Sequence, residues 1–279
     1  MSNYINQQAE ADFYRAYRKG RFNLTKLFFK QRELLPFNEV QQLVKAKDQS
    51  YLGIRSVALS DIVGSEERAD DFSEGFWPKN AFLKTRWVSV SKAYHNNINL
   101  PVIQLYKLGS LYFIRDGNHR VSVAKALGVA YIDAEITELS AKIKLQADWS
   151  IEQIKEAVVA FERTDFLAKT HLGDVIDMNN IIFTKPGSYE KLLNHIMVHK
   201  YYLNEKIGGT ISLAEAASSW YSYIYMPIIL IIEKNNFFNL KNKADLYLTL
   251  VNQWEKLKKQ SKEAKVNQAV KALKHKKRR

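Results

Sequence analysis

The amino-acid sequence predicts an α+β protein: a small mixed-sheet α/β core, flanked by an N-terminal helical segment and an α-helical C-terminal domain. Residues 101–115 are rich in β-branched and aromatic side chains on either side of a short turn, which is typical of a β-hairpin. Before residue 50 and after residue 140, apolar residues recur instead at helical spacings. With 279 residues, 46% of them hydrophobic, the chain can form one large or two ordinary domains with buried cores.

The N-terminal helical segment, residues 1–50, is predicted to be helical from residue 4 to residue 48. Pro36 is expected to start a new segment within it. The apolar residues at helical spacing are Phe13, Ala16 and Tyr17, then Leu24, Leu27 and Phe28, and after the proline Phe37, Val40, Leu43 and Val44.

Residues 51–140 are predicted to form the α/β unit. Ile54, Val57 and Leu59 indicate a strand, and Gly64–Ser65 indicate a turn. Gly128 is expected to end a helix, since glycine readily takes the left-handed C-terminal position. The other expected elements are a helix over 86–94, hairpin strands over 101–106 and 111–115 joined by 107–110, a helix over 118–127 and a strand over 131–136.

Residues 141–255 are predicted to form the helical domain. Ser150 with Gln153, and Ser212 with Glu215, have the spacing of capping boxes and therefore indicate two helix N-termini. The last long helix is expected from Asn242 to about Lys259. Gly187–Ser188 is expected to open a further helix, and Pro227 to kink the helix that contains it.

The formal net charge of +13 lies mostly in a basic tail, residues 256–279. This tail has eleven Lys or Arg residues and one acidic residue, Glu263, which leaves a charge of only +3 on the rest of the chain. Two interpretations are open. The tail contacts nucleic acid or another acidic surface, or it is a solvated helical end that keeps the protein in solution.

The chain contains no cysteine, so disulfide bonds, thiolate metal sites and a cysteine nucleophile are excluded. The polar N-terminus does not look like a signal peptide. The most apolar run, residues 220–232, contains Pro227 and is shorter than the roughly 20 apolar residues that cross a bilayer. We therefore expect a soluble, cytoplasmic protein with no membrane partner.

The segment Asp116–Arg120 is the strongest candidate for a functional site. A strand is expected to end just before it, the chain turns at Gly117, and a helix begins at once. The first amides of a helix have no internal acceptors and, together with the helix dipole, favour an anion such as phosphate. Arg120 adds a charged fork of donors, and His119 adds a group that donates or moves a proton near neutral pH.

The role of Asp116 in this segment is open, because a carboxylate repels phosphate. It caps the turn by accepting backbone N–H groups, or it holds Mg²⁺, which prefers one or two carboxylates plus phosphate oxygens. Asn118 and Ser122 add neutral hydrogen-bonding groups. The alternative to a ligand site is that Asp116 and Asn118 are only turn and cap residues and that His119 is a packed surface histidine.

Residues 100–136, LPVIQLYKLGSLYFIRDGNHRVSVAKALGVAYIDAEI, resemble the core of ParB/sulfiredoxin-type domains. The D-G-N-H-R turn is similar to that of ParB-like free-serine kinases. In this superfamily the turn contacts nucleotide phosphates: CTP in partition proteins, and ATP or ADP in sulfiredoxin and the kinases. The resemblance implies a nucleotide with Mg²⁺ here. The residues on the family pattern of a G-x-x-R turn, an Ala-rich helix and a Leu-Gly stop are Gly117, Arg120, Ala124, Leu127 and Gly128.

Residues 54–72, IRSVALSDIVGSEERADDF, resemble the family's first strand and the loop that faces the phosphate turn. This implies that Gly64, Ser65 and Arg68 lie near the ligand. In the serine kinases an upstream glutamate acts as base, which implies this role for Glu66 or Glu67; a solvated acidic loop is the alternative. Elements spread along the chain are Leu34–Val40, Tyr51–Gly53 and the later segments KPGSYEKLLNHIMVHKYYL, EAASSWYSYIYMP and ADLYL. With them, about residues 9–250 resemble a bacterial family of uncharacterised ParB-like proteins that end in a helical domain of unknown function.

Two patterns in the helical domain have alternative interpretations. His195 and His199 have the spacing of a two-histidine metal site, but Ile196 stands where the zinc proteases need a glutamate. The two histidines otherwise line a helix–helix groove or contact an anionic ligand. The aromatic run of residues 220–225 stacks on bases or packs in the core, and the helical spacing of its members favours the core.

Three functions follow from these observations. The first is a nucleotide-binding protein that takes ATP, ADP or CTP with Mg²⁺ at the D-G-N-H-R turn and hydrolyses it or transfers phosphate. The second is a non-enzymatic DNA-binding ParB-like regulator, and the third a small-molecule hydroxyl kinase. We also keep a homodimer among the expected partners. The candidate catalytic residues are Asp116, His119, Glu66 and Glu67, the candidate metal ligand is Asp116, and the candidate nucleotide contacts are Gly64, Ser65, Arg68, Gly117, Asn118, His119, Arg120 and Ser122.

Overall fold

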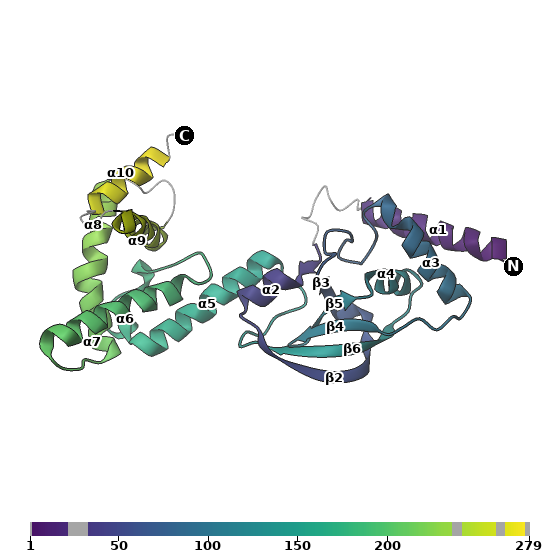
Figure 1. The fold of residues 1–279 in the computed structure, drawn as a ribbon, viewed down its shortest axis with the longest axis horizontal. Helices are drawn as coiled ribbons and strands as arrows, with labels where there is room; N and C mark the ends of the chain where they lie inside the picture. Colours follow the sequence, from purple (N-terminus) through teal and green to yellow (C-terminus); the bar gives the residue numbers. More distant parts are fainter. Residues whose placement is uncertain (1, 22–32, 236–241, 261–265, 277–279) are drawn as a thin grey trace. The chain divides into compact units, whose positions relative to one another are not determined.

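The computed structural model describes residues 2–21, 33–235, 242–260 and 266–276. The fold is α+β, as the sequence predicts, and it divides into two compact units, Met1–Ile154 and Lys155–Arg279 (Figure 1). No helix in the described ranges is long and apolar enough to cross a membrane. The predicted helix that contains Leu24, Leu27 and Phe28 lies outside the described residues.

The first unit is built on a six-stranded mixed sheet with the strand order β1-β3-β5-β4-β6-β2. The first three strands of this order run parallel, so their C-terminal ends meet at one edge of the sheet. Helices α2 (Phe37–Leu43) and α4 (Asn118–Ala126) begin at that edge, directly after β1 and β5. The strands are β1 (Leu35–Pro36), β2 (Lys47–Ala58), β3 (Ile62–Ser65), β4 (Ile103–Leu108), β5 (Leu111–Asp116) and β6 (Tyr131–Ser140).

Helices cover both faces of this sheet. On one face, α1 (Ser2–Arg21), α3 (Lys84–His95) and α4 share a core with alternate strand residues such as Ile114. Successive strand side chains point to opposite faces, so the neighbouring Phe113 points to the other one. There α2 places Phe37 against Tyr106, with the rings stacked at 4.3 Å between centroids. The N-terminal helix and the sheet therefore belong to one folding unit.

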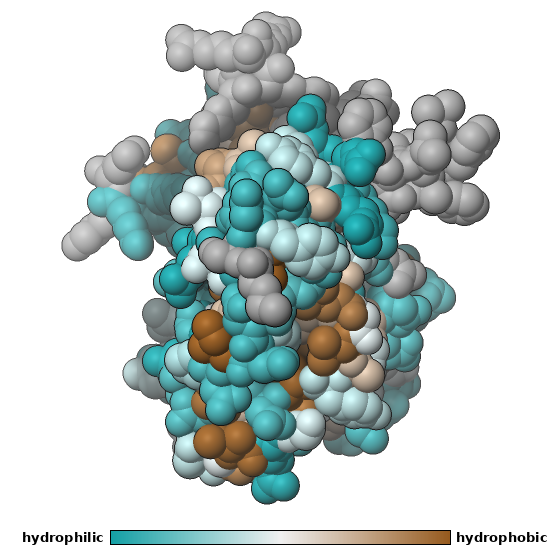
Figure 2. All heavy atoms as spheres, turned by 90° about the vertical axis from the view of Figure 1, so that its right-hand side faces the viewer, coloured by the Kyte–Doolittle hydropathy of each residue, from teal (hydrophilic) through white to brown (hydrophobic). Residues whose placement is uncertain are grey.

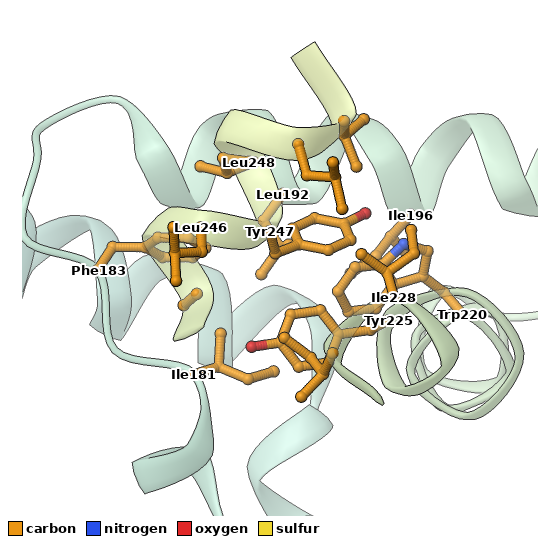
Figure 3. Packing of buried hydrophobic residues seen from close by; sticks show 14 of the residues in the cluster. Ile181, Phe183, Leu192, Ile196, Trp220, Tyr225, Ile228, Leu246, Tyr247 and Leu248 are labelled. Atoms are coloured by element: carbon orange, nitrogen blue, oxygen red, sulfur yellow. The ribbon is translucent and has the colours of Figure 1, made fainter. Parts of the chain in front are cut away.

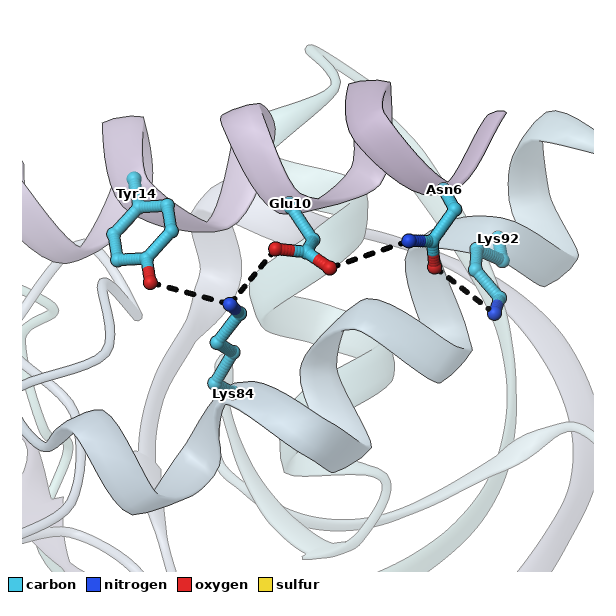
Figure 4. Close-up of polar contacts among 5 residues, drawn as sticks. All are labelled: Asn6, Glu10, Tyr14, Lys84 and Lys92. Atoms are coloured by element: carbon cyan, nitrogen blue, oxygen red, sulfur yellow. Dashed lines mark hydrogen bonds and ion pairs between the residues drawn. The ribbon is translucent and has the colours of Figure 1, made fainter. Parts of the chain in front are cut away.

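A row of polar contacts joins α1 to α3 at the surface of the first unit (Figure 4). Lys84 donates to Glu10 at 2.8 Å and to Tyr14 at 3.2 Å. Asn6 donates to Glu10 at 3.2 Å and accepts from Lys92 at 3.3 Å. Because these groups are exposed or only partly buried, they orient the helices more than they stabilise them.

The prediction of a turn at Gly64–Ser65 is wrong. Both residues are the last two of β3, and they pair with Leu35 and Pro36 on one side. A Cβ on Gly64 would lie 2.1 Å from the carbonyl oxygen of Leu35 and 2.7 Å from the ring of Phe113. Glycine is therefore needed here for close packing between parallel strands, not for a turn. The strand expected from Ile54 also starts earlier, at Lys47. The prediction that residues 4–48 are helical is therefore wrong for Leu35–Pro36, which is β1, and for the last two residues, which belong to β2.

The second unit is helical and is organised around an aromatic core (Figure 3). Trp220 and Tyr247 meet edge to face at 5.7 Å, and Tyr225 lies 4.9 Å from Tyr247. The core prediction for the aromatic run is thus confirmed for Trp220 and holds for Tyr225. It is wrong for Tyr223 and Ile224, which share the helical spacing of Trp220 but are 75% and 37% exposed. The helices are α5 (Ile151–Thr170), which begins at the end of the first unit, α6 (Ser188–Ile207), α7 (Leu213–Trp220), α8 (Met226–Lys234), α9 (Lys243–Gln260) and α10 (Val266–Lys276).

The two predicted capping boxes are present, at Ser150 and at Ser212. Between α7 and α8 the chain makes a π-helical turn, Tyr221–Tyr225, in which the N–H of Met226 bonds to the carbonyl of Tyr221. Pro227 follows at once, and its missing N–H leaves the carbonyl four residues earlier without its usual donor. The wider turn is the local adjustment to that proline.

Part of the basic segment 256–279 is packed helix rather than a solvated tail. Lys256, Lys258 and Lys259 lie exposed on α9, and α10 follows. Ala269 and Val270 of α10 are buried in the core of the second unit. The charges of Lys256, Lys258, Lys259 and Lys271 therefore lie exposed on these two helices.

Candidate functional site

The turn between β5 and α4 has the geometry of a helix-start anion site. Gly117 is the N-cap residue of α4 and has φ +113°, a conformation that favours glycine. A Cβ there would also lie 2.4 Å from the Cγ2 of Ile103. The first intrahelical bond runs from the N–H of Val121 to the carbonyl of Gly117 at 3.0 Å. The amides of residues 118–120 come before it and have no acceptor within the helix.

Two consecutive side chains in this first turn have a buried polar atom without a hydrogen-bond partner. They are Asn118 Oδ1 and His119 Nδ1, and Asn118 as a whole is only 7% exposed. The described residues contain six such atoms, and only these two come from neighbouring residues. A buried polar group without a partner costs about 1–3 kcal/mol, so it is usually satisfied by water or a ligand.

His119 lies in a dry and electropositive environment. Phe72, from the loop after β3, contacts its ring edge to face, with centroids 5.7 Å apart. Burial, together with the charges of Arg68 and Arg86, lowers the pKa of His119 to about 4, and Asp71 offsets this only in part. The imidazole is therefore neutral at pH 7 and carries one N–H donor.

Arg120 is bound by the protein itself. Its guanidinium donates to the carbonyl oxygens of Pro101 and Val102, and to Asp116 Oδ2 at 2.5 Å. The Arg120 side chain is only 13% exposed, whereas that of Asp116 is 68% exposed. Arg120 thus ties the turn to the start of β4. The sequence predicts a guanidinium that is free to bind phosphate, but the donors of Arg120 are engaged by the protein itself.

Three predicted nucleotide contacts lie in the interior of the first unit. Ser122 is fully buried and accepts a hydrogen bond from the indole N–H of Trp87 at 2.8 Å. Ser65 is also fully buried, and its hydroxyl accepts from the N–H of Arg68 at 3.3 Å. Gly64 is packed between strands, as described above. We therefore leave these three residues out of the candidate site.

The two candidate glutamates are not brought to His119 by any described contact. Burial of the ring, together with the charge of Glu66, raises the pKa of Tyr106, and the Tyr106 ring stacks on Phe37 of α2 on the face of the sheet opposite α4. The guanidinium of Arg115 lies over that same ring at 5.7 Å. Glu67 is exposed, and the described part of the chain shows no side-chain partner for it.

The structure adds three residues that the sequence analysis missed: Phe72, Asp71 and Arg86. Asp71 forms an ion pair with Arg68 at 3.3 Å, which helps to place Arg68 beside the histidine. Arg86 lies in the first turn of α3, and only tertiary packing brings it to α4. The N-terminal position of Arg86 in a predicted helix is the one signal in the sequence, and it does not indicate a ligand.

The turn offers one carboxylate, that of Asp116, as a metal ligand. The described residues contain no group of three or more acidic or histidine side chains that could hold an ion. Asp116 is a single exposed carboxylate, and one of its oxygens already accepts from Arg120. Such a donor set suits Mg²⁺ that arrives with phosphate oxygens, because that ion often takes one carboxylate from the protein.

In the second unit, the two histidines of α6 contact neighbouring helices. His195 Nδ1 lies 3.1 Å from the hydroxyl of Tyr247, and His199 Nε2 lies 3.0 Å from the hydroxyl of Ser219. Burial lowers the pKa of both imidazoles. These contacts agree with the interpretation that the histidines line a helix–helix groove.

No protein-family model, curated protein or solved structure matches the chain. The resemblance to ParB/sulfiredoxin-type domains therefore stays a prediction. A function for the chain is therefore inferred from the geometry of the β5–α4 turn.

Proposed function

We propose that the chain is a nucleotide-binding protein whose phosphate site is the first turn of α4. The observation that carries this proposal is the unpartnered buried Nδ1 of His119, which can donate from the neutral imidazole and lies beside helix amides that have no acceptor within the helix. The helix dipole favours an anion at this position. The positive charges of Arg68 and Arg86, which act on the same histidine, favour it further.

In this proposal the groups in and around the turn bind the phosphate in different ways. The amides of residues 118–120 donate to phosphate oxygens, and the neutral imidazole of His119 adds a donor from its side chain. Arg68 and Arg86 supply charge. Arg120 acts as a positioning residue, because its bonds to Pro101 and Val102 hold the turn against β4.

The nucleotide itself, ATP, ADP or CTP, is proposed from the resemblance. Mg²⁺ would be held by phosphate oxygens with Asp116 as its one protein ligand, and it would supply charge neutralisation at the phosphates. Hydrolysis, or transfer to a small hydroxyl compound, needs a base near the terminal phosphate. Asp116 and His119 lie at the turn and are the candidates for that role, whereas no described contact brings Glu66 or Glu67 to it.

Calorimetric titration of the purified chain with ATP, ADP, CTP and GTP in the presence of Mg²⁺ tests the proposal. We expect saturable binding of at least one nucleotide, and at least about tenfold weaker binding by Asn118→Asp, because the new carboxylate repels phosphate. Asn252→Asp, an equal charge change at an exposed position of α9, is the matched control. Absence of binding by the wild type, or equal binding by Asn118→Asp, would overturn the proposal.

A second candidate function rests on a separate observation in the second unit. Lys256, Lys258, Lys259 and Lys271 are all exposed on the ordered helices α9 and α10. Such a basic surface suits a nucleic-acid backbone, which the DNA-binding regulator requires. Its binding would weaken steeply with salt concentration, whereas nucleotide binding at α4 does not depend on these lysines.

A further inference from the structure

We infer that the outward side of α6 pairs with the same side of a second copy of the chain, in antiparallel orientation, to form a homodimer. This inference goes beyond the proposed nucleotide site, because it concerns a surface of the second unit. The surface consists of four exposed side chains of α6, which we call the α6 stripe: Met197, Val198, Tyr201 and Tyr202.

The α6 stripe is unusual among the exposed apolar side chains of the protein. Its four members are 50–63% exposed and fall within six consecutive residues. Elsewhere in the described ranges, no stretch of that length has more than two exposed large apolar side chains. The face shown in Figure 2 has the usual pattern, in which apolar atoms lie in separate groups among hydrophilic ones.

The opposite side of the same helix already faces the core of the second unit. Leu192 and Ile196 are fully buried there (Figure 3). Val198 comes two residues after Ile196, and two residues correspond to about 200° around a helix. A helix that is apolar on more than one side is usually buried on each of them. The α6 stripe is therefore a surface that the described part of its own chain leaves uncovered.

The charges at the two ends of the stripe determine the orientation. Lys191 and Glu205 are both exposed, seven residues before and seven residues after Val198. Seven residues make about two full turns, so both charges lie on the same side of the helix as Val198. Antiparallel pairing about Val198 then places Lys191 of each copy level with Glu205 of the other. Parallel pairing would bring like charges together, which is unfavourable.

This pattern is self-complementary, which favours a second copy over other partners. An interface with two-fold symmetry uses the same surface patch on both subunits, as the α6 stripe would. Aromatic residues and methionine are enriched at such interfaces. Helices that bind membrane surfaces carry mainly Lys and Arg beside their apolar side. Here Glu205 instead accepts a hydrogen bond from Tyr201 at 2.8 Å, so a carboxylate lies beside the stripe.

Sedimentation equilibrium of the full chain, from micromolar to near-millimolar concentration, tests the inference. We expect the wild type to form a reversible dimer. Lys191→Glu and Glu205→Lys should each raise the dissociation constant of the dimer at least about tenfold, because each places like charges opposite each other twice. The double variant exchanges the two charges and should restore the wild-type value. Each single change suits the helix dipole, so the variants should stay folded.

Disulfide cross-linking tests the orientation, since the chain contains no cysteine of its own. On oxidation, Val198→Cys should form a covalent dimer, because the two copies of residue 198 meet at the two-fold axis. Lys191→Cys is the matched control. In antiparallel pairing its two copies lie about 21 Å apart along the helices, which is too far for a disulfide.

A wild type that stays monomeric at every concentration would overturn the inference. A dimer that the charge variants leave unchanged would also overturn it, because the interface would then lie elsewhere. Cross-linking of Lys191→Cys as readily as Val198→Cys would contradict the antiparallel orientation. A monomer that binds anionic lipid vesicles, and loses this binding in Val198→Glu, would assign the stripe to a membrane surface instead.

Discussion

Phe72 packs edge to face against the imidazole of His119, with the two rings inclined at 82°. This contact brings the loop after β3 over the first turn of α4. The loop is held in shape by its own backbone bonds, from Ser73 to Trp77 at 2.9 Å and from Phe76 to Ser73 at 2.7 Å. The histidine is therefore shielded from water before any ligand arrives, which is the main reason for its low pKa.

Stability should depend on pH through His119. An unfolded histidine has a pKa of about 6.5, and the folded value is about 4. Between these two pKa values the unfolded chain binds more protons than the folded protein does. The neutral imidazole therefore contributes its full stability above about pH 6.5. This contribution is lost as the pH falls toward about 4. We expect His119→Gln to reduce the fall in unfolding free energy on acidification by about 1–3 kcal/mol.

Urea denaturation of the wild type and of His119→Gln at pH 7 and at pH 5 measures this effect. His171→Asn is the matched control, because His171 is exposed and asparagine tolerates its positive φ of 50°. An identical pH dependence in wild type and His119→Gln would show that the imidazole is not held neutral by its surroundings.

Gly117→Ala should destabilise the first unit strongly. The added Cβ would meet Ile103 at 2.4 Å in a backbone conformation with φ +113°. We expect a loss of at least about 2 kcal/mol in unfolding free energy. Gly109→Ala is the control, because Gly109 also has positive φ but nothing lies within 4 Å of its Cβ position. It should cost only about 1 kcal/mol, and equal losses in the two variants would contradict this account of the turn.

Arg120 and Asp116 should contribute unequally to stability, although they form one ion pair. Arg120→Ala removes the donor from two backbone carbonyls as well as from the carboxylate, so we expect a loss of about 1–3 kcal/mol. Asp116→Asn changes a largely exposed group and should cost less than about 1 kcal/mol. Thermal melts of the two variants compare these losses of stability. A larger loss for Asp116→Asn than for Arg120→Ala would mean that the ion pair, and not the carbonyl contacts, holds the turn.

The basic surface of α9 and α10 should be tested by charge reversal, because truncation disturbs the core. Deletion of residues 266–279 removes Ala269 and Val270 from the second unit, and we expect a lower melting temperature. The combined change of Lys256, Lys259 and Lys271 to Glu alters exposed side chains and leaves the contact of Lys258 with the ring of Trp254 at 3.9 Å in place. If the surface binds nucleic acid, this variant should lose the salt-dependent binding in a filter assay; unchanged binding would exclude these lysines.

Much of the fold could be predicted because its signals are local. Gly128 ends α4 with φ +75°, and Gly109 turns the hairpin with φ +65°. The capping boxes at Ser150 and Ser212 depend on residues only three apart. The need for glycine at position 64 could not be predicted, because the atom that leaves no room for a side chain is the carbonyl oxygen of Leu35, which is distant in the sequence.

The candidate site was predictable only in part. The start of α4 at Asn118 follows from the strand, the glycine and the helical spacing that surround it. Ser122 is bound by Trp87, and the positive charge near His119 comes from Arg68 in the loop after β3 and from Arg86, which like Trp87 lies on α3. Such neighbours are set by tertiary packing, which spacing along one segment does not encode.

The central claim is that phosphate binds on the first turn of α4. The most direct measurement follows the amide and imidazole NMR signals of residues 118–120 during titration with ADP and Mg²⁺. We predict saturable shifts of the amides of Asn118, His119 and Arg120, and a rise in the pKa of His119 from about 4, because a nearby anion favours the charged imidazole. Nucleotide binding that leaves these signals and this pKa unchanged would contradict the claim.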